Sequence, residues 1–543
     1  MSLSKIFCGE YPEMTLFVLK YLRDDLKSLY SCILVNRSLC RMTIPILWEN
    51  PFELKCLDGK RDFIKNYFIF FSRLERKKLI EFGAKIEPIS TPLFNYPSFI
   101  KTLDTFRMEL HVINWVNNLN TILSTPRGKD TYRYTITFLD YEKEVFLIKN
   151  HNSRLKKIVD TLCGFLLKSF IINNASLKNF NLKISNSHGH YLPKFFQMIF
   201  DNATFVSHVE NFRVGFIANP HVLNFSQLES LFTSLPSSLP LVKNFHISYI
   251  ARSKNLNNML KSKAVLLSLN VSLDAFNYYN NRLTSIEFHR CNFKNVDTFD
   301  ELNDFTQLRY LSFINCKSIK PQFFQPLLDT QTPLKLKSLK LTGPPTGFDL
   351  LIQKAGYYLE NLELFLFGAS GQVYESIRIH CDQIKFFHLA NLHHDDNSQL
   401  YGMITRNNES LKYLTIASCM SGKMNSKFLC GLASLLPKSL EYLDLEIVID
   451  IKGLKTFLSN LRHVELNTLL FRHKIKNESF DVFDIVTDFV IQNKIRNFSY
   501  RLNKCFNPYD HDIFALFNMV NFERPSVKLE RYSDLVVSLS DFY

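Results

Sequence analysis

The sequence has little glycine and no glycine-rich loop. Only 16 of its 543 residues are glycine, so loops that cradle phosphate have little material. The Walker, dinucleotide-binding, nucleophile-elbow, HExxH and kinase signatures are all absent. We therefore expect no catalytic residue, no cofactor and no enzymatic activity.

Long apolar runs and paired cysteines are also missing. No stretch approaches the roughly 20 consecutive apolar residues of a membrane-spanning helix, and the first residues lack a signal-peptide pattern. The 11 cysteines are odd in number and form no C-x-x-C pair, which favours reduced thiols over disulfides or a zinc site. We expect a soluble intracellular protein, in the cytoplasm, the nucleus or both, with no structural metal and no membrane association.

The formal net charge is +14, which favours acidic partners at low salt. The basic clusters at 73–78 and 154–157 are short, lie outside the repeats described below, and contain no RNA-recognition aromatic signature. They are more simply solvated helix faces. We therefore do not expect a nucleic-acid partner.

One cluster, His393-His394-Asp395-Asp396, has the chemistry of metal ligands. Adjacent residues cannot all converge on one ion, and no second group of ligands at a suitable spacing accompanies them. We expect a loop after the strand that begins near Ile384, not a metal site.

What the chain does contain is a repeated pattern, apolar-x-x-apolar-x-apolar. Twelve copies begin at Leu177, Val209, Val242, Leu283, Leu308, Leu336, Leu359, Ile384, Leu411, Leu440, Leu461 and Ile495. From Leu283 to Leu461 the starts lie 21 to 29 residues apart. This is the period of a leucine-rich repeat, in which one strand and one return segment stack per unit. A possible further copy at Leu266 leaves the repeat count open.

The fold class that this pattern predicts is α/β, with a curved solenoid and a parallel sheet over 171–543. One repeat cannot bury its apolar edge alone, whereas a run of neighbours makes a continuous core. Cys291, Cys316 and Cys419 occupy the Asn/Cys position of their repeats, and we expect them to be buried packing residues, not ligands.

Residues between the apolar positions of each strand should face the opposite side of the sheet. Aromatic side chains at these outward positions would lie near one another on successive strands and anchor a protein partner, since a few aromatic residues usually dominate an interface. Acidic neighbours would favour a basic segment of that partner. The predicted partner-binding residues are Tyr310, Phe365, Phe386, Tyr413, Tyr442, Asp444 and Glu446. His463 and Glu465 are expected to face the same side on the following unit, where Glu465 would add to the acidic group.

Three short helices precede the repeats. Pro12 suits a first helical turn, which predicts a helix over about 12–22. Asp24 and Asp25 can cap a second helix, and Asn36 can cap a third that we expect to end before Pro45, because the residue preceding proline avoids the helical region. A segment of about 40 residues buries too little apolar surface to be stable alone. We therefore expect these helices to pack on another part of the chain or on a partner.

These residues resemble an F-box over 8–52. The resemblance rests on Tyr11-Pro12-Glu13-Met14, Leu16, Asp24-Asp25-Leu26, Leu29, Cys32, Leu34-Val35-Asn36-Arg37, Cys40 and Leu47-Trp48, with Leu39 where many F-boxes carry Trp. It implies docking on the Skp-type adaptor of a cullin-RING ubiquitin ligase, with the repeats capturing a protein substrate. The adaptor contacts that it implies are Pro12, Leu16, Leu26, Leu29, Leu34, Val35 and Leu39.

Three alternatives stay open. The first helices could be a plain helical cap of the solenoid, since terminal repeats need one. The chain could be a leucine-rich-repeat scaffold that binds a protein without any ligase. A nucleic-acid-binding solenoid would show steep salt dependence of binding.

Between 53 and 170 we expect a mostly helical connecting region. The apolar spacing predicts helices over 62–82, 98–123 and 154–169, and the alternation over 132–139 predicts a strand. The simplest role of this region is to hold the N-terminal helices at a set distance from the repeats.

Overall fold

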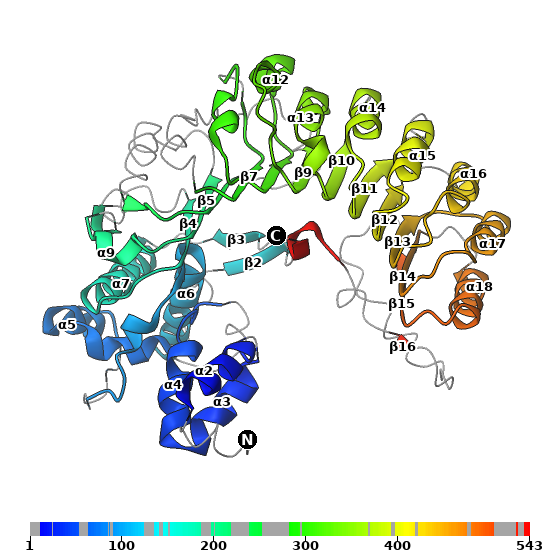
Figure 1. Ribbon diagram of the computed structural model, residues 1–543. Helices are drawn as coiled ribbons and strands as arrows, with labels where there is room; N and C mark the ends of the chain where they lie inside the picture. The colour runs from blue at the N-terminus through cyan, green and yellow to red at the C-terminus, as the bar shows by residue number, and fades with distance from the viewer. Residues whose placement is uncertain are drawn as a thin grey trace. The chain divides into compact units, whose positions relative to one another are not determined.

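The computed structural model describes residues 11–23, 25–53, 63–84, 86, 91–123, 135–140, 145–149, 153–185, 197–199, 201–218, 238–251, 282–293, 296–367, 370–392, 397–418, 422–474, 479–503, 528–529 and 537–542. The chain divides into two compact units, Met1–Val265 and Leu266–Tyr543. Figure 1 labels the helices and strands of both units.

The N-terminal unit begins with three helices that we call the head: α2 (Pro12–Tyr21), α3 (Leu26–Val35) and α4 (Arg37–Leu47). The predicted helix starts are confirmed. Pro12 lies in the first turn of α2, the Asp25 carboxylate accepts the N–H groups of Lys27 and Ser28, and the Asn36 side chain accepts the N–H of Leu39 at 2.8 Å.

The predicted end of the third helix is wrong, because α4 continues through Pro45. Proline removes one backbone hydrogen bond from a helix and disfavours it. Here the last turn carries Ile44 and Ile46, which are 8% and 5% exposed. The helix also closes with a bond from the Trp48 N–H to the Ile44 carbonyl. Packing of the apolar face therefore outweighs the local preference.

Trp48 joins the head to the connecting region. Its ring lies 5.4 Å from the Tyr67 ring and 4.4 Å from the Tyr96 ring, measured between centroids. The Glu49 carbonyl accepts the N–H groups of Lys101 and Thr102, both at 3.0 Å. The three helices thus pack on the residues that follow, as their small size requires.

The connecting region is less regular than predicted. The helix expected over 62–82 is split into η2 (Phe63–Phe70) and α5 (Arg73–Glu81). Ser72 between them forms a capping box with Glu75, which starts a new helix. The 3-10 turn η3 (Tyr96–Phe99) follows.

The helix expected from Ser98 begins only at Thr105, because the preceding residues form a strand. β1 (Thr102–Asp104) pairs in parallel with β4 (Asn179–Ser185), and α6 (Thr105–Leu123) follows β1 directly. The predicted strand near 132–139 is confirmed as β2 (Thr135–Asp140). It pairs with β3 (Val145–Lys149), which the sequence did not reveal. α7 (Ser153–Ile172) confirms the last predicted helix.

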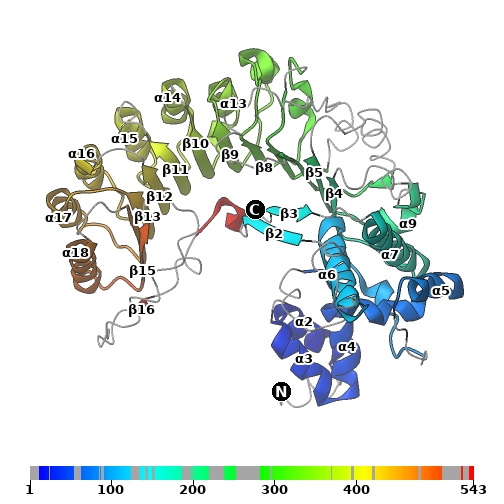
Figure 2. The same cartoon turned by 180° about the vertical axis from the view of Figure 1, so that it is seen from behind.

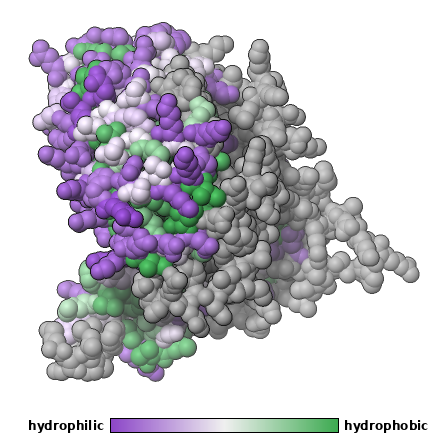
Figure 3. All heavy atoms as spheres, turned by 90° about the vertical axis from the view of Figure 1, so that its right-hand side faces the viewer, coloured by the Kyte–Doolittle hydropathy of each residue, from purple (hydrophilic) through white to green (hydrophobic). Residues whose placement is uncertain are grey.

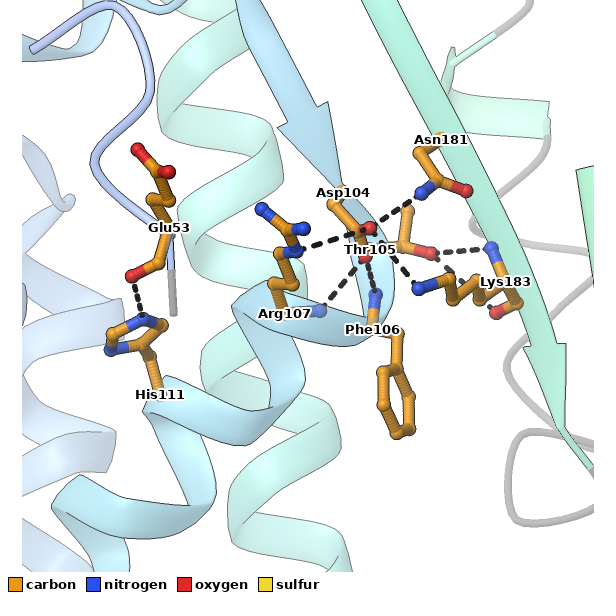
Figure 4. A network of polar contacts seen from close by, with 8 residues as sticks. All are labelled: Glu53, Asp104, Thr105, Phe106, Arg107, His111, Asn181 and Lys183. Atoms are coloured by element: carbon orange, nitrogen blue, oxygen red, sulfur yellow. Dashed lines mark hydrogen bonds and ion pairs between the residues drawn. The ribbon is translucent and has the colours of Figure 1, made fainter. Parts of the chain in front are cut away.

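Asp104 connects three elements at this point (Figure 4). It is 5% exposed, and its Oδ1 accepts the first N–H groups of α6, those of Phe106 and Arg107, at 2.9 Å. Its Oδ2 accepts the Asn181 amide of β4 at 2.6 Å and lies 3.4 Å from Lys183 Nζ. One buried carboxylate thus fixes α6 and β1 to β4.

In the same unit, α9 (Ala203–Val206) precedes β5 (Asn211–Ala218), and β6 (Asn244–Ala251) follows. These strands continue the sheet in the order β1-β4-β5-β6, and every pair is parallel. The copies of the pattern at Leu177, Val209 and Val242 therefore each lead into a strand, as predicted.

The C-terminal unit repeats a strand followed by a return segment, with the helices on one side of the strands (Figure 2). Its strands pair in parallel from β7 to β15 in chain order, and β16 (Lys528–Leu529) pairs with β15. The strands are β7 (Ser285–His289), β8 (Tyr310–Ile314), β9 (Ser338–Gly343), β10 (Asn361–Leu366), β11 (Phe386–Leu392), β12 (Tyr413–Ser418), β13 (Tyr442–Ile447), β14 (Thr468–Lys474) and β15 (Asn497–Asn503). The return segments carry η6 (Asp300–Asp304), η7 (Pro321–Phe324), α12 (Gln325–Asp329), α13 (Phe348–Ala355), η8 (Gly356–Tyr358), α14 (Gly371–His380), α15 (Asn397–Arg406), α16 (Gly422–Ala433), α17 (Ile451–Asn460) and α18 (Ser479–Gln492), and η10 (Leu539–Phe542) lies near the end of the chain.

The predicted α/β fold with a parallel sheet is confirmed, and the apolar positions form its core. In the copies that begin at Leu283 through Leu440, all three apolar residues are at most 1% exposed. Cys291 and Cys316 are buried as expected, and the Cys316 thiol donates to the Phe288 carbonyl at 3.4 Å. Cys419 and the copy at Leu266 lie outside the described residues.

One predicted copy is wrong by five residues. Leu461 follows α17 and lies in a turn, not at the start of a strand. β14 instead uses Leu466-x-x-Leu469-x-Phe471, which places its start 26 residues after Leu440 and 29 before Ile495. His463 and Glu465 therefore precede the strand and do not occupy its outward positions.

The Asp104 network leads to a stability prediction. Asp104→Ala should lower the free energy of unfolding of the N-terminal unit by about 3 kcal/mol, because it leaves the α6 N–H groups uncapped and Lys183 without this carboxylate. Hydrogen exchange of the α6 and β4 amides measures the change. Glu210→Ala, which removes partly exposed pairs with Lys178 and Lys243, is the control and should cost at most about 1 kcal/mol. Equal effects of the two substitutions would contradict the structural role of Asp104.

Candidate functional site

The head divides its apolar residues between an internal core and an outer surface. Leu19, Leu29, Leu39 and Ile46 pack together, with Leu16 partly buried against them. Two residues predicted to contact an adaptor, Leu29 and Leu39, are thus 0% and 3% exposed. In this structure they stabilise the head and offer no surface, while Leu16 and Leu26 are half-buried.

The outward side of α2 carries a second apolar stripe that the sequence analysis did not separate from the first. Met14, Phe17, Val18 and Tyr21 follow the i, i+3, i+4, i+7 spacing of one helix face. They are 49%, 61%, 39% and 75% exposed. The rings of Phe17 and Tyr21 contact each other at 5.1 Å between centroids. α2 is therefore apolar on two faces, and only one face is used inside the head.

α3 also exposes apolar side chains. Tyr30, Leu34 and Val35 are 41%, 86% and 64% exposed. We call the exposed apolar residues of α2 and α3, together with Pro12, the head surface. The lower lobe in Figure 3, which is the head, shows hydrophobic side chains in green. Of the predicted adaptor contacts, Pro12, Leu34 and Val35 belong to this surface.

A second candidate surface is the side of the C-terminal strands that faces away from the helices. Parallel pairing brings Tyr310, Ser338, Asn361, Phe386, Tyr413 and Tyr442 into one row, each opposite the next. The predicted aromatics Phe386, Tyr413 and Tyr442 lie on adjacent strands, as expected. Tyr310 lies on the same row, with Ser338 and Asn361 between it and Phe386.

Three of these aromatics are buried by the chain itself. Tyr310, Phe386 and Tyr442 are 2%, 0% and 3% exposed. Leu539, near the end of the chain, packs in one cluster with Tyr310 and Phe386 and is itself 1% exposed. Burial raises the pKa of the Tyr442 hydroxyl. Sequence reasoning could not identify this cover, because residues 537–542 carry no repeat pattern.

Phe365 behaves differently from the other predicted aromatics. It sits near the end of β10, is 38% exposed, and contacts the Phe367 ring at 4.8 Å between centroids. Phe367 is 45% exposed and was not predicted, because it lies beyond the outward positions that we considered. It lies five residues after Leu362, the position that Cys316 occupies relative to Leu311. An aromatic residue at this position departs from the pattern, and that departure could have marked Phe367 as a candidate binding residue. We call Phe365 and Phe367 the exposed aromatic pair.

Two of the predicted acidic residues, Asp444 and Glu446, share one cation of the chain. Asp444 is 2% exposed and its carboxylate lies 3.3 Å from the Arg472 guanidinium of β14. The same guanidinium lies 2.5 Å from Glu446. Glu465 is exposed in the turn before β14, so the acidic residues do not form one group. Arg472 offsets only one of the two negative charges of Asp444 and Glu446, so the attraction for a basic partner segment stays a prediction.

The middle of the same face is also paired internally. Lys340 Nζ lies 2.8 Å from the Glu363 carboxylate, and His388 Nδ1 lies 3.7 Å from it. Burial lowers the pKa of His388, although the Glu363 carboxylate opposes that shift. The burial of His388 therefore favours its neutral form. Each of these carboxylates lies beside a cation, but the two cations Lys340 and Arg472 face the three carboxylates Glu363, Asp444 and Glu446. One negative charge therefore remains on this part of the face.

The N-terminal unit shows a different chemistry at the equivalent row. The Asn244 amide donates to Asn211, Asn211 donates to Asn179, and Asn179 donates to Thr102, at 2.5, 2.5 and 2.9 Å. This ladder of amides satisfies its own hydrogen bonds along the strands. The aromatic row thus distinguishes the C-terminal unit.

Metal and membrane sites are not found in the part of the chain that the structure describes. No three His, Cys, Asp or Glu side chains there lie close enough to hold a metal ion. The His393–Asp396 cluster lies outside the described residues. Among the described helices, none is both long enough and apolar enough to span a membrane.

Arg472 gives a direct test of the charge arrangement. Arg472→Met should lower the free energy of unfolding of the C-terminal unit by about 3 kcal/mol, because Asp444 stays buried without its cation. Hydrogen exchange of the β13 and β14 amides measures the loss. Arg462→Met, at an exposed position of the same unit, is the matched control and should change the stability by less than about 0.5 kcal/mol. An unchanged stability of the Arg472 variant would show that the buried carboxylate does not depend on this pair.

Comparison with known proteins does not assign the chain to a family. No protein-family model matches the sequence. No curated protein matches it significantly either.

Proposed function

We propose that this protein is a substrate-recognition adaptor of a ubiquitin ligase. Its head, as an F-box, docks on a Skp-type adaptor of a cullin ligase, and its strands, as leucine-rich repeats, capture a protein target. The contribution of such a subunit is proximity, since it holds the target near the transferring enzyme and performs no bond chemistry itself.

The observation that carries the proposal is the second apolar stripe of α2. A helix that only caps a solenoid needs one apolar face, turned inward, and a polar outer face. α2 instead exposes Met14, Phe17, Val18 and Tyr21 on the face opposite to its core residues. Contiguous exposed apolar surface marks a protein-binding site.

α3 extends this argument. Leu34 is 86% exposed, the second-highest value among the exposed large hydrophobic residues described in the chain. It stands one turn after Tyr30 on the same helix face. The ordered F-box-like residues and the exposed stripe come from separate observations, sequence and packing. Both favour a partner over a plain cap.

The attachment of the head also suits this function. Trp48 packs on Tyr67 and Tyr96, and Asp104 ties the following helix to β4. These contacts hold the head at a fixed position relative to the first strands of the N-terminal unit. A flexible tether would not hold a target at a set distance from a ligase.

The head surface can be tested with one substitution. Leu34→Asp should reduce capture of a Skp-type adaptor by at least about ten-fold, because it places a charge in the apolar contact. Pull-down of the full chain with purified adaptor measures this. Leu74→Asp is the matched control, since Leu74 is 79% exposed on α5, outside the head. Its capture should equal that of the unmodified chain.

Two results would contradict the proposal. Absence of any adaptor capture by the unmodified chain would favour a protein-binding scaffold without ligase association. Equal capture by the Leu34 and Leu74 variants would move the contact away from the head surface.

The target-binding side is tested separately. The double substitution Phe365→Ala and Phe367→Ala should remove co-purifying target protein by about ten-fold, because exposed aromatic residues usually dominate an interface. Adaptor capture should not change. Tyr357→Ala, which alters a residue 62% exposed in η8 on the helix side, is the control. Identical sets of co-purified proteins for all three chains, measured by quantitative mass spectrometry, would exclude this pair.

A further inference from the structure

The strand face of the C-terminal unit already holds an apolar segment, and the segment comes from the same chain. η10 contacts β9 and β10. Leu539 packs against Tyr310 and Phe386, and Val537 and Tyr413 pack at the margin of this cluster. Figure 1 shows η10, in red, on the strand side of this unit.

The surface beneath Leu539 has a definite form. Tyr310 and Phe386 stand three strands apart in one row, and the two strands between them carry Ser338 and Asn361. These two short side chains are hydrogen-bonded to each other, with Asn361 Nδ2 donating to Ser338 Oγ at 3.0 Å. Short side chains flanked by rings leave room for one aliphatic side chain. We call Tyr310, Ser338, Asn361 and Phe386 the strand patch.

The segment adds a backbone contact and a turn of its own. The Val537 N–H donates to Tyr442 Oη at 3.3 Å. The Asp541 carboxylate accepts the Ser538 N–H at 2.6 Å and the Ser538 hydroxyl at 3.3 Å. The segment therefore presents an aliphatic residue, then a leucine two positions later, in a turn closed by an acidic residue.

Among the described contacts, Leu539 and Val537 pack on the strand face and the Val537 N–H donates to Tyr442. These contacts must offset the conformational entropy of ordering residues 537–542. Because the segment belongs to the same chain, it also has a high effective concentration at the strand patch. A peptide of the same chemistry on another protein can make the same contacts and so compete with the segment.

We propose that the strand patch is the binding site for a short target segment with the pattern aliphatic-x-leucine-x-acidic, and that residues 537–542 occupy this site until the target displaces them. The inference rests on the proposed function for the role of the bound protein as a ligase target. The chemistry of the site rests on the contacts described above. Phe365 and Phe367 on β10 and just beyond it then contact the remainder of the target.

The test uses a fluorescein-labelled synthetic peptide with the sequence of residues 535–543 and the full chain. Leu539→Asp should withdraw the internal segment from the strand patch, so this variant should bind the labelled peptide at least about ten-fold more tightly than the unmodified chain. Fluorescence anisotropy measures the binding. Val537→Asp, at the partly buried end of the segment, should act in the same direction.

Three controls make the result specific. Ile379→Asp, at a residue 46% exposed on α14, should leave peptide binding as in the unmodified chain. Adding Ser338→Phe to the Leu539→Asp chain should abolish the gain, because the ring fills the space beneath the leucine. A labelled peptide in which aspartate replaces the leucine should not bind any chain.

Equal peptide binding by the unmodified, Leu539→Asp and Val537→Asp chains would overturn the inference, provided that hydrogen exchange shows β8 to β11 still protected. Gain of binding that survives Ser338→Phe would also overturn it. Adaptor capture is measured on the same preparations. If the unmodified chain captures no adaptor, the proposed ligase role is refuted, but the peptide-binding result for the strand patch still stands. Failure of the proposed function and failure of this inference are therefore distinguishable.

Discussion

Burial of the repeated apolar positions determines where every other strand side chain points. Three positions per copy lie in the interior, at most 1% exposed from Leu283 to Leu445. Because side chains alternate along a strand, this burial forces the intervening residues to the opposite face. Parallel pairing in register then sets residues of equivalent position side by side. The aromatic row, the paired charges and the amide ladder all follow from that single constraint.

The two candidate surfaces differ in how the chain treats them. The head exposes an apolar stripe on α2 that its own core does not need. The strand face instead pairs its carboxylates with cations of the same chain, with Arg472 beside Asp444 and Glu446, and it covers Tyr310 and Phe386 with Leu539. In the described structure the first surface is therefore exposed, and the second is occupied by a segment that we propose a target displaces. A subunit that binds a ligase constantly and a target conditionally would use such a division.

Much of the fold is predictable from the sequence, because two periodicities coincide. Apolar residues alternate along each strand, and the strand pattern recurs about every 25 residues. The errors occur where local signals compete with packing. Pro45 stays helical because its neighbours are buried, and Leu461 imitates a repeat start that the spacing to Ile495 argues against. The contact of residues 537–542 with strands more than a hundred residues earlier in the chain has no local signal. The adaptor residues were similarly divided only by the structure, since Leu29 and Leu34 look equivalent in sequence.

The central claim is that the head binds a Skp-type adaptor through α2 and α3. Hydrogen exchange of the full chain, with and without purified adaptor, tests this most directly. The account predicts slower exchange in α2 and α3 and unchanged exchange in β8 to β13. Protection confined to the strands, or no protection anywhere at saturating adaptor, would contradict it.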